Sequence, residues 1–384
     1  MAGFFAAVGM AGFWCKIYGF DIISINDVQG KVEEALDKIV SIQDSLKMPN
    51  RLFIDVRTPQ EFAQGHLPGA INIPIFSNEE RAIVGTLYKQ VSVDAAKQRG
   101  LEFVSSKLPA IIQSISDYAK QGYQIVIYCW RGGMRSKSIV ALLDTLDIAA
   151  RQLIGGYKSY RRYILDGLET YKLRSEIVVL AGSTGVGKTT ILKELAAKGH
   201  PTIDLEGLAN HRGSVFGQIG LGKSTTMPMF EAAVLEFLEK YQDKPYIIVE
   251  CESSQIGNVY IPKVLRDGMS IGKKILVQAS VSTRVQRIID EYSSPRAIDA
   301  EKIAHCIKAI GKYLGRKKTD FLLQCLANNQ IELLVSSLLV DYYDPLYGYD
   351  NSKNAQYEAI INAENLEYAT AELDTYLKRR YTGW

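Results

Sequence analysis

The sequence predicts an α/β protein built from two parallel-sheet domains, and two observations support this prediction. Short apolar runs rich in β-branched residues alternate with stretches that have helical spacing of apolar residues; these runs lie at 51–56, 123–129, 176–182, 246–252 and 273–280. Alternation of strand and helix is typical of parallel α/β layers. The chain has 384 residues, which is long for a single hydrophobic core.

The order of segments predicts where the domains begin and end. Residues 95–122 have the apolar spacing of a helix between the first two strands, and the chain from about residue 301 also reads as helical. A tyrosine-rich, basic stretch at 155–176 lacks a long apolar run and marks the boundary. We therefore expect an apolar N-terminal extension, a first domain, and a second domain with a helical C-terminal region, at residues 1–21, 22–165 and 170–384.

Composition limits the classes of function. With 45 basic and 42 acidic side chains the net charge is +3, so RNA binding would have to depend on local patches. The five cysteines are scattered and show no CxxC spacing, which favours a reducing cytoplasm over a disulfide framework. The apolar first fourteen residues follow no basic residue and are too short to span a bilayer. We expect a cytoplasmic protein that does not bind membranes.

The first candidate site surrounds Cys129, which ends the strand at 123–129. The loop that follows has the composition of an anion cradle: glycines that allow a tight turn, two guanidinium groups, and a helix start that Ser136 or Ser138 could cap. A thiolate there would have a lowered pKa and could act as a nucleophile. A buried strand-end thiol is the alternative. The loop residues are Arg131, Gly132, Gly133, Met134, Arg135 and Ser136.

An upstream segment favours the nucleophile. The stretch "DVRTPQEFAQGHLPGAINIP" (55–74), together with Cys129 and the "RGGMRS" that follows Trp130, resembles the rhodanese signature. The resemblance implies a rhodanese domain over roughly residues 22–165, in which Cys129 carries the chalcogen. It also implies that Asp55 and Arg57 organise the fold near the loop.

The second candidate site is a phosphate loop. The stretch "GSTGVGKT" (182–189) matches G-x-x-x-x-G-K-[ST] between a predicted strand and a predicted helix, which is the context this motif requires. Its amides would cradle a di- or triphosphate, the lysine would reach the outer oxygens, and the following threonine could hold Mg²⁺. The diphosphate-binding residues are Gly182, Gly185, Gly187, Lys188, Thr189 and Thr190.

Two further segments bear on this site. Glu250 and Glu252 follow the strand that begins at Tyr246, where P-loop enzymes often keep a metal-linked carboxylate, so Thr189 and Glu250 are the candidate metal ligands. The stretch 204–217, which contains glycines at intervals, is either a substrate loop or a polar surface loop. As a substrate loop, it would act through Glu206, His211 and Arg212.

Together these motifs resemble the tRNA 2-selenouridine synthase family. A rhodanese domain precedes a P-loop domain that carries "DLEGLANHRGSVFG" and "VECESSQIGNVYIP", and "GTLYKQ" and "DYYDPLYGY" are also similar. Cys251 stands where the family usually has an acidic residue. The resemblance implies that wobble 2-thiouridine in the tRNA anticodon loop is converted to 2-selenouridine through S-geranyl-2-thiouridine. The substrates would be geranyl diphosphate and selenophosphate, with Mg²⁺ as cofactor and a selenophosphate-supplying enzyme as partner.

A local patch could grip the tRNA. Basic residues alternate with tyrosines that could stack on unpaired bases; the patch comprises Lys158, Arg161, Arg162, Lys172 and Arg174, with Tyr157, Tyr160, Tyr163 and Tyr171. Residues 315–320 and 377–381 are weaker candidates. Two other functions stay open from the residues alone: an ATP-dependent P-loop sulfurtransferase with a rhodanese sulfur carrier, and a binding module in which Cys129 senses redox state.

Overall fold

The structure is a computed structural model that describes residues 38–250, 253–292, 300–347 and 357–382. The chain divides into two compact units, residues 1–163 and 164–384, and each is described here by itself. The expected apolar extension, 1–21, and the start of the expected domain 22–165 lie outside the described residues.

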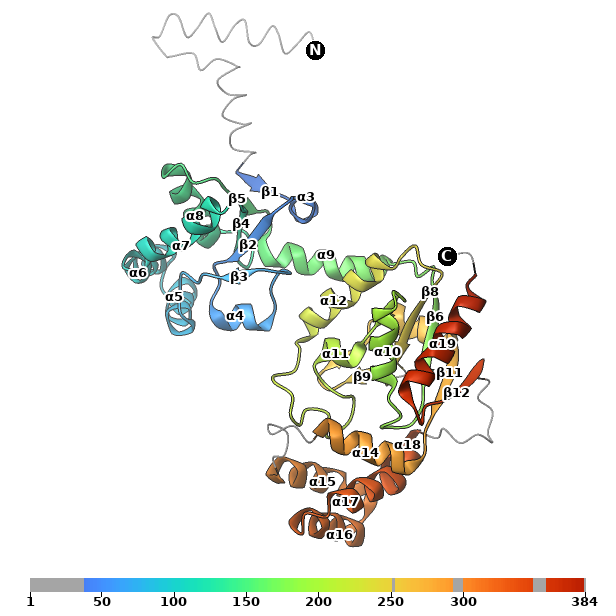
Figure 1. Ribbon diagram of the computed structural model, residues 1–384. Coiled ribbons are helices and arrows are strands. Elements are labelled where there is room, and N and C mark those ends of the chain that lie inside the picture. Colours follow the sequence, from blue (N-terminus) through green and yellow to red (C-terminus); the bar gives the residue numbers. More distant parts are fainter. Residues whose placement is uncertain (1–37, 251–252, 293–299, 348–356, 383–384) are drawn as a thin grey trace, which may run out of the picture. The chain divides into compact units, whose positions relative to one another are not determined.

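The first unit contains a five-stranded parallel sheet in the order β1-β5-β4-β2-β3 (Figure 1). Strand β4 is buried from Ile125 to Tyr128, as its unbroken apolar run predicts for a parallel strand covered on both faces. The strands are β1 (Ile39–Val40), β2 (Arg51–Asp55), β3 (Ile71–Asn72), β4 (Gln124–Tyr128) and β5 (Ala150–Leu153).

Helices connect these strands. Capping boxes start two of them: Thr58 and Glu61 cap α4, and Ser77 and Glu80 cap α5. The single helix expected at 95–122 is wrong, because the segment breaks into α6 and α7, with Pro109 in the first turn of α7, where a missing N–H is tolerated. The helices are α3 (Ile42–Lys47), α4 (Pro59–Gln64), α5 (Asn78–Gln90), α6 (Val93–Ser105), α7 (Leu108–Lys120) and α8 (Met134–Thr145), and α9 (Gly156–Thr170) crosses the boundary between the units.

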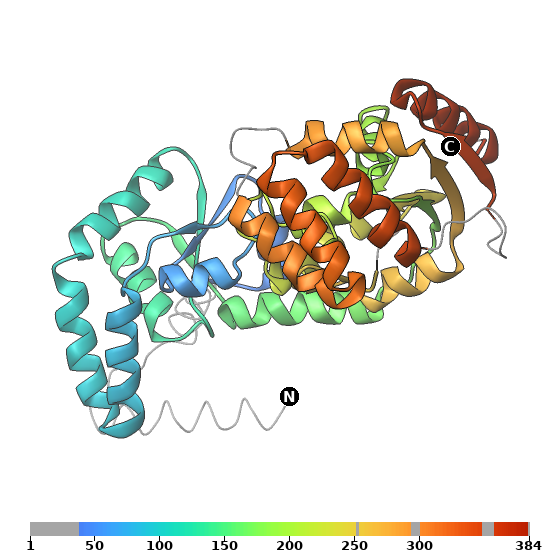
Figure 2. The same cartoon turned by 90° about the horizontal axis from the view of Figure 1, so that it is seen from below.

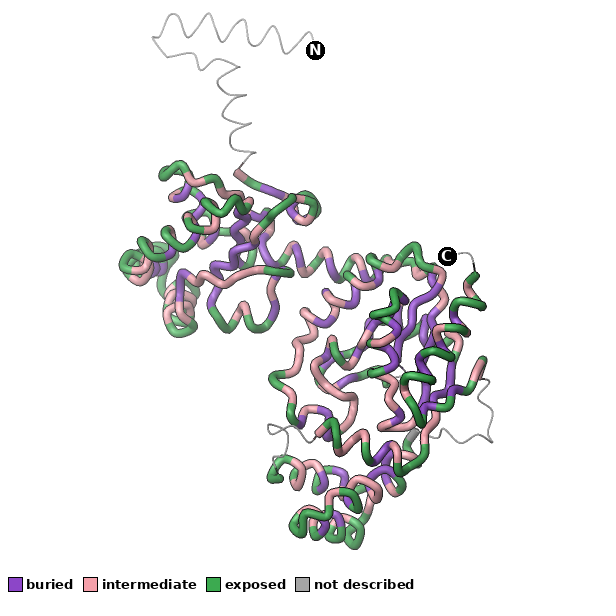
Figure 3. Tube along the Cα trace, in the orientation of Figure 1, coloured by how far each residue is buried: buried purple, intermediate pink, exposed green. Residues whose placement is uncertain are grey.

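The second unit contains another five-stranded parallel sheet, in the order β12-β11-β6-β8-β7, and a small antiparallel hairpin of β9 and β10. Figure 3 shows the buried residues following the strands of this sheet. Strand β12 was not expected, because four residues inside a largely helical region leave little periodicity to detect. The strands are β6 (Glu176–Ala181), β7 (Thr202–Ile203), β8 (Tyr246–Glu250), β9 (Gln255–Ile256), β10 (Val259–Tyr260), β11 (Lys273–Gln278) and β12 (Ala359–Asn362).

Helices α10 and α19 lie side by side against the sheet of the second unit, where their apolar residues share a core with β6, β8 and β11 (Figure 1). Helices α15, α16 and α17 pack together beside α14 (Figures 1 and 2). The α/β class and the helical C-terminal region are confirmed. The helices are α10 (Lys188–Ala197), α11 (Leu205–Ala209), α12 (Met227–Lys240), α13 (Lys263–Ile271), α14 (Val281–Tyr292), α15 (Ala300–Leu314), α16 (Arg316–Ala327), α17 (Ile331–Leu338), the π-helix η1 (Leu339–Tyr343), α18 (Asp344–Tyr347) and α19 (Leu366–Arg380).

Candidate functional sites

Cys129 lies directly after β4, with only 3% of its surface exposed. The hydroxyl of Ser136 donates a hydrogen bond to its sulfur at 3.2 Å. Burial alone would raise the pKa of Cys129, but the hydrogen bonds from Ser136 and the backbone amide of Arg131, with the charge of Arg135, outweigh burial and lower it. The geometry therefore favours a thiolate at this position.

The loop after Cys129 is held by contacts that the motif does not reveal. Helix α8 begins after Gly133 without a side-chain cap, so the expected capping by Ser136 or Ser138 is wrong. Ser136 instead lies in the first turn and faces the sulfur. Gln152 of β5 donates to the Gly132 carbonyl and to the Ser136 hydroxyl, both at 2.8 Å. No local pattern marks Gln152, because its partners are sixteen to twenty residues away.

The two arginines of the loop differ in their surroundings. Arg135 forms an ion pair with Glu61 of α4 at 2.8 Å, so part of its charge is already balanced. Burial alone would raise the pKa of Glu61, but the bond to Arg135 outweighs it and the pKa is lowered. Arg131 is exposed, as is Met134. Arg131 is therefore the better placed of the two to meet an incoming anion.

Asp55 and Arg57 form a fully buried ion pair beside this loop. The Arg57 Nη2 donates to Asp55 at 2.6 Å and to the Gly65 carbonyl at 2.6 Å. The guanidinium carbon lies 4.1 Å from the ring centroid of Tyr157. The pair thus connects the end of β2, the end of α4 and the start of α9. It supports the fold next to the loop that follows Cys129.

The first turn of α9 is anchored on the backbone of Cys129 and Trp130. The amide of Tyr157 donates to the Cys129 carbonyl at 2.8 Å, and the amide of Lys158 donates to the Trp130 carbonyl at 2.9 Å. Gly156 has a φ of 59°, and a Cβ there would lie 2.2 Å from the Cys129 carbonyl oxygen. The close approach requires glycine at this position.

The phosphate loop joins β6 to α10, in the context that the motif requires. Gly182 and Gly187 have φ values of 152° and 95°, and a Cβ on Gly182 would lie 2.4 Å from the Val277 carbonyl oxygen. The ammonium of Lys188 donates to the Gly182 carbonyl at 2.7 Å. The lysine is therefore folded over the loop that would cradle the phosphates.

Two carboxylates converge on this loop. Glu250 is fully buried, and pairing of β6 with β8 places it opposite Leu180, next to the start of the loop. The Thr189 hydroxyl lies 3.2 Å from Glu250 and 3.3 Å from Glu206, and the Glu206 amide donates to Glu250 at 2.8 Å. Burial and the nearby charge of Glu206 raise the pKa of Glu250 to about 8. Glu252 lies outside the described residues.

Of the three residues predicted for the substrate loop, Glu206 and Arg212 line the same pocket and His211 does not. Glu206 joins Thr189 and Glu250, whereas the ring of His211 lies between Gly217 and Gly257. Burial lowers the pKa of His211, with a smaller effect from Arg212. Arg212 donates to the Ile219 carbonyl at 2.8 Å, pairs with Glu291, and lies along the pocket described next.

A pocket of about 530 Å³ opens directly from the phosphate loop. One end is formed by Thr184, Gly185, Lys188, Thr189 and Thr190, with Glu206 beside them. A group of apolar side chains, called here the apolar chamber, lines much of the remainder and comes from the loop between α11 and α12, α14, α15, α17 and η1. They are Phe216, Ile219, Ile288, Ile289, Tyr292, Ile303, Ile331, Leu334, Val335, Leu338, Leu339 and Tyr343. The pocket is also lined by Lys193, Arg212, Ser214, Arg287, Asp290, Glu291 and Leu366. The pocket thus suits a ligand with a phosphate head and a hydrocarbon body.

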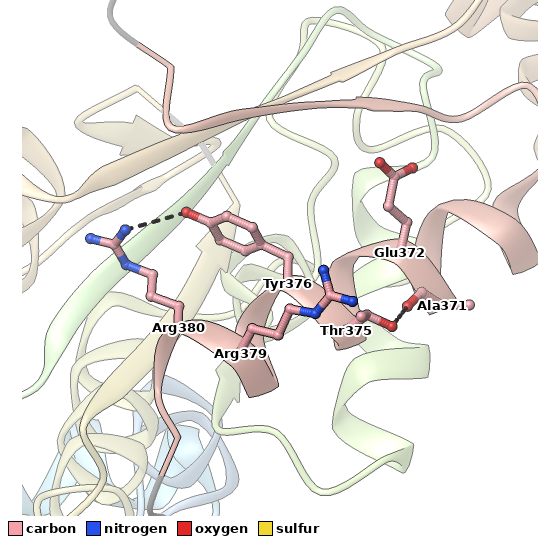
Figure 4. A pocket seen from close by; sticks show the side chains of 6 residues that line it. All are labelled: Ala371, Glu372, Thr375, Tyr376, Arg379 and Arg380. Carbon is pink, nitrogen blue, oxygen red and sulfur yellow. Dashed lines mark hydrogen bonds between the residues drawn. The ribbon is translucent and has the colours of Figure 1, made fainter.

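A shallower hollow lies on α19 and is lined by residues of that helix alone (Figure 4). Arg379 and Arg380 project from it, within the weaker RNA candidate 377–381. Arg380 is engaged by Glu358 at 2.9 Å. None of its lining residues lines the phosphate-loop pocket, so we assign it no catalytic role.

Helix α9 carries most of the predicted tRNA patch, and Tyr171, Lys172 and Arg174 follow its end. Lys158 and Arg162 are exposed, and Arg161 is half-buried. Tyr157 and Tyr160 are buried, so the expectation that they stack on bases is wrong. The helix is amphipathic, and these two tyrosines lie on its buried face; Ile164 and Leu168 continue that face at helical spacing.

Comparison with known sequences gives the family. The sequence model described as the tRNA 2-selenouridine synthase AAA domain matches residues 175–379, and the rhodanese-like domain matches residues 39–163. The tRNA 2-selenouridine synthase of Nitrosomonas eutropha is 32% identical over 77% of this chain and 87% of its own length. The chain belongs to the tRNA 2-selenouridine synthase family. The synthase of Pseudomonas savastanoi pv. phaseolicola is 31% identical over 85% of this chain and 94% of its own length.

Membership in this family confirms the resemblance noted in the sequence. The chain is therefore an enzyme of the transferase class and combines a rhodanese domain with a P-loop domain. Within the described residues, no helix is both long enough and apolar enough to cross a membrane.

Proposed function

We propose that the chain replaces sulfur by selenium in the wobble 2-thiouridine of tRNA, in two steps at two sites. In the first step, the 2-thio sulfur attacks C1 of geranyl diphosphate; the S–C bond forms as the C–O bond breaks, and diphosphate leaves with the electron pair. N3 of the base loses its proton to solvent, which leaves the S-geranyl base neutral. In the second step, the selenium anion derived from selenophosphate attacks C2 of the S-geranyl base. The C–S bond then breaks and the geranyl thiolate leaves and takes up a proton.

The observation that carries the first step is the apolar chamber joined to the phosphate loop. A nucleotide would place a polar sugar and base next to its phosphates, whereas a prenyl diphosphate would place a hydrocarbon there. Burial of hydrocarbon stabilises by about 0.8 kcal/mol for each CH₂ group. Outside the phosphate loop, most of the side chains that line the pocket are aliphatic or aromatic, and the charged ones are a minority, so the lining favours the prenyl ligand.

The residues of the loop would stabilise the leaving group. Lys188 and the amides of 182–189 would bind the diphosphate oxygens as negative charge grows on them. Thr189, Glu250 and Glu206 provide a hydroxyl and two carboxylates within about one hydrogen-bond length of each other, a donor set that suits Mg²⁺. Bound there, Mg²⁺ would supply further neutralisation of the diphosphate.

The second step is proposed for the Cys129 site. Its lowered pKa favours a thiolate, which can take the proton of a water that attacks the phosphorus of selenophosphate; the P–Se bond breaks, phosphate forms, and selenium leaves at the selenide level as the anion that attacks C2. Exposed Arg131 would attract the incoming anion. A selenophosphate-supplying enzyme in the same cytoplasm is the implied partner.

One experiment tests this scheme. The full chain, tRNA bearing 2-thiouridine, geranyl diphosphate and Mg²⁺ should suffice for S-alkylation without any nucleotide, as read by mass spectrometry of the digested nucleosides. Cys129→Ser should keep alkylation but lose selenium incorporation, and Lys188→Ala should lose alkylation. A strict ATP requirement, with tRNA-stimulated ATP hydrolysis, would contradict the proposal and favour the ATP-dependent sulfurtransferase.

A further inference from the structure

A buried arginine connects the phosphate loop with the wall of the apolar chamber. Arg284 of α14 is 4% exposed, and its Nε donates to the carbonyl of Thr184, inside the phosphate loop, at 2.8 Å. Its Nη1 and Nη2 donate to the two carboxylate oxygens of Asp344 at 3.0 and 2.6 Å. One rigid guanidinium therefore spans the two segments.

The segment on the Asp344 side forms part of the chamber. Asp344 directly follows η1, and Leu339 and Tyr343 of η1 line the apolar chamber. A π-helix is rare and usually occurs at functional sites. Whatever fixes the position of η1 thus also fixes the carboxylate that orients Arg284.

We propose that Arg284 and Asp344 are positioning residues that couple the two ends of the pocket. Through them, binding of the hydrocarbon part of the ligand increases the affinity of the phosphate loop for the diphosphate. A chain packed against Leu339 and Tyr343 holds η1 in place, Asp344 then orients Arg284, and Arg284 fixes the Thr184 carbonyl. The inference rests on the proposed function, since it requires a ligand that fills both ends of the pocket. Coupling between sites of this kind is typically about 5- to 150-fold in affinity.

The chain offers a matched control three residues before Asp344, on η1 itself. Asp341 also forms an ion pair, with Lys318 of α16 at 2.5 Å, and accepts from Ser337 at 2.9 Å. Neither Lys318 nor Ser337 belongs to the phosphate loop. Asp341→Asn therefore removes an equivalent charge from η1 without touching the connection through Arg284.

The test measures the dissociation constants of inorganic diphosphate and of geranyl diphosphate by calorimetry in the presence of Mg²⁺. The dissociation constant of inorganic diphosphate divided by that of geranyl diphosphate gives the factor by which the hydrocarbon chain increases affinity. We expect Asp344→Asn to reduce this ratio about fivefold or more, Asp344→Glu to keep most of it, and Asp341→Asn to leave it within about twofold of the wild-type value. If Asp344→Asn proves unfolded by its thermal melt, Arg284→Lys, which keeps the charge but loses the bidentate fork, should reduce the ratio instead.

The outcomes separate two kinds of failure. An equal weakening of both ligands in Asp344→Asn or Arg284→Lys would leave the ratio unchanged, and the pair would then be merely structural. A wild-type ratio near one would mean that the chamber does not bind the chain, which overturns the proposed function itself.

Discussion

The hydrogen bond from Ser136 to Cys129 gives a quantitative prediction. Gln152 donates to the Ser136 oxygen, so the hydroxyl proton is left for an acceptor, either the sulfur 3.2 Å away or the Gly133 carbonyl 3.3 Å away. A hydrogen bond to a charged group is worth about 1.5 to 3 kcal/mol, and at this length we take the lower value. One pKa unit corresponds to about 1.36 kcal/mol, so Ser136→Ala should raise the pKa of Cys129 by roughly one unit.

The sign follows from which form is stabilised. The serine favours the thiolate, so its removal favours the thiol, and reactivity should move to higher pH. The assay is the rate of iodoacetamide alkylation against pH, read on the peptide that contains Cys129 because the chain has other cysteines. Ser138→Ala is the control, since Ser138 donates to the Arg135 carbonyl and not to the sulfur. An unchanged or lower pKa in Ser136→Ala would refute the reasoning.

Two other predictions concern ligand and tRNA. Val335→Trp, which fills part of the apolar chamber, should weaken the binding of geranyl diphosphate about tenfold in calorimetry, since displacing two CH₂ groups loses about 1.6 kcal/mol. Its affinity for inorganic diphosphate should not change, and the exposed control Val340→Trp should bind both ligands like the wild type. Equal weakening of both ligands in Val335→Trp would contradict this placement of the hydrocarbon chain. Arg162→Glu should weaken tRNA binding in a filter-binding assay, and the slope of the logarithm of affinity against the logarithm of salt concentration should become shallower by roughly one unit. Arg99→Glu on α6 is the control, and an equal slope in the two variants would exclude Arg162 from the interface.

Local patterns predicted the parts of the protein that depend on neighbouring residues. Unbroken apolar runs predicted the buried strands. Cys129 and Lys188 belong to motifs whose spacing is set by a single loop between a strand and a helix. The same reasoning failed on α9, where interleaved tyrosines suggested a stacking surface although the helical spacing of Tyr157 and Tyr160 puts them on the buried face.

What the sequence could not predict are contacts between distant segments. Gln152 reaches the cysteine loop from the neighbouring strand, and Glu206 reaches Thr189 from a separate helix. The apolar chamber is assembled from five segments, of which only the loop that contains Phe216 overlaps a stretch predicted from the sequence to bind substrate. Such sites exist only once the chain has folded, because the sheet edge and the packing of helices bring their parts together.

The anchoring of α9 has a consequence for dissecting the protein. Amides of Tyr157 and Lys158 hold the carbonyls of Cys129 and Trp130, and Gly156 lies against the same backbone. A rhodanese fragment that stops after β5 would therefore lack the contacts that hold Cys129 and its loop, although every residue of the rhodanese signature is present. A fragment that extends through Tyr160 keeps these anchors, so the functional boundary of the first domain lies inside a helix.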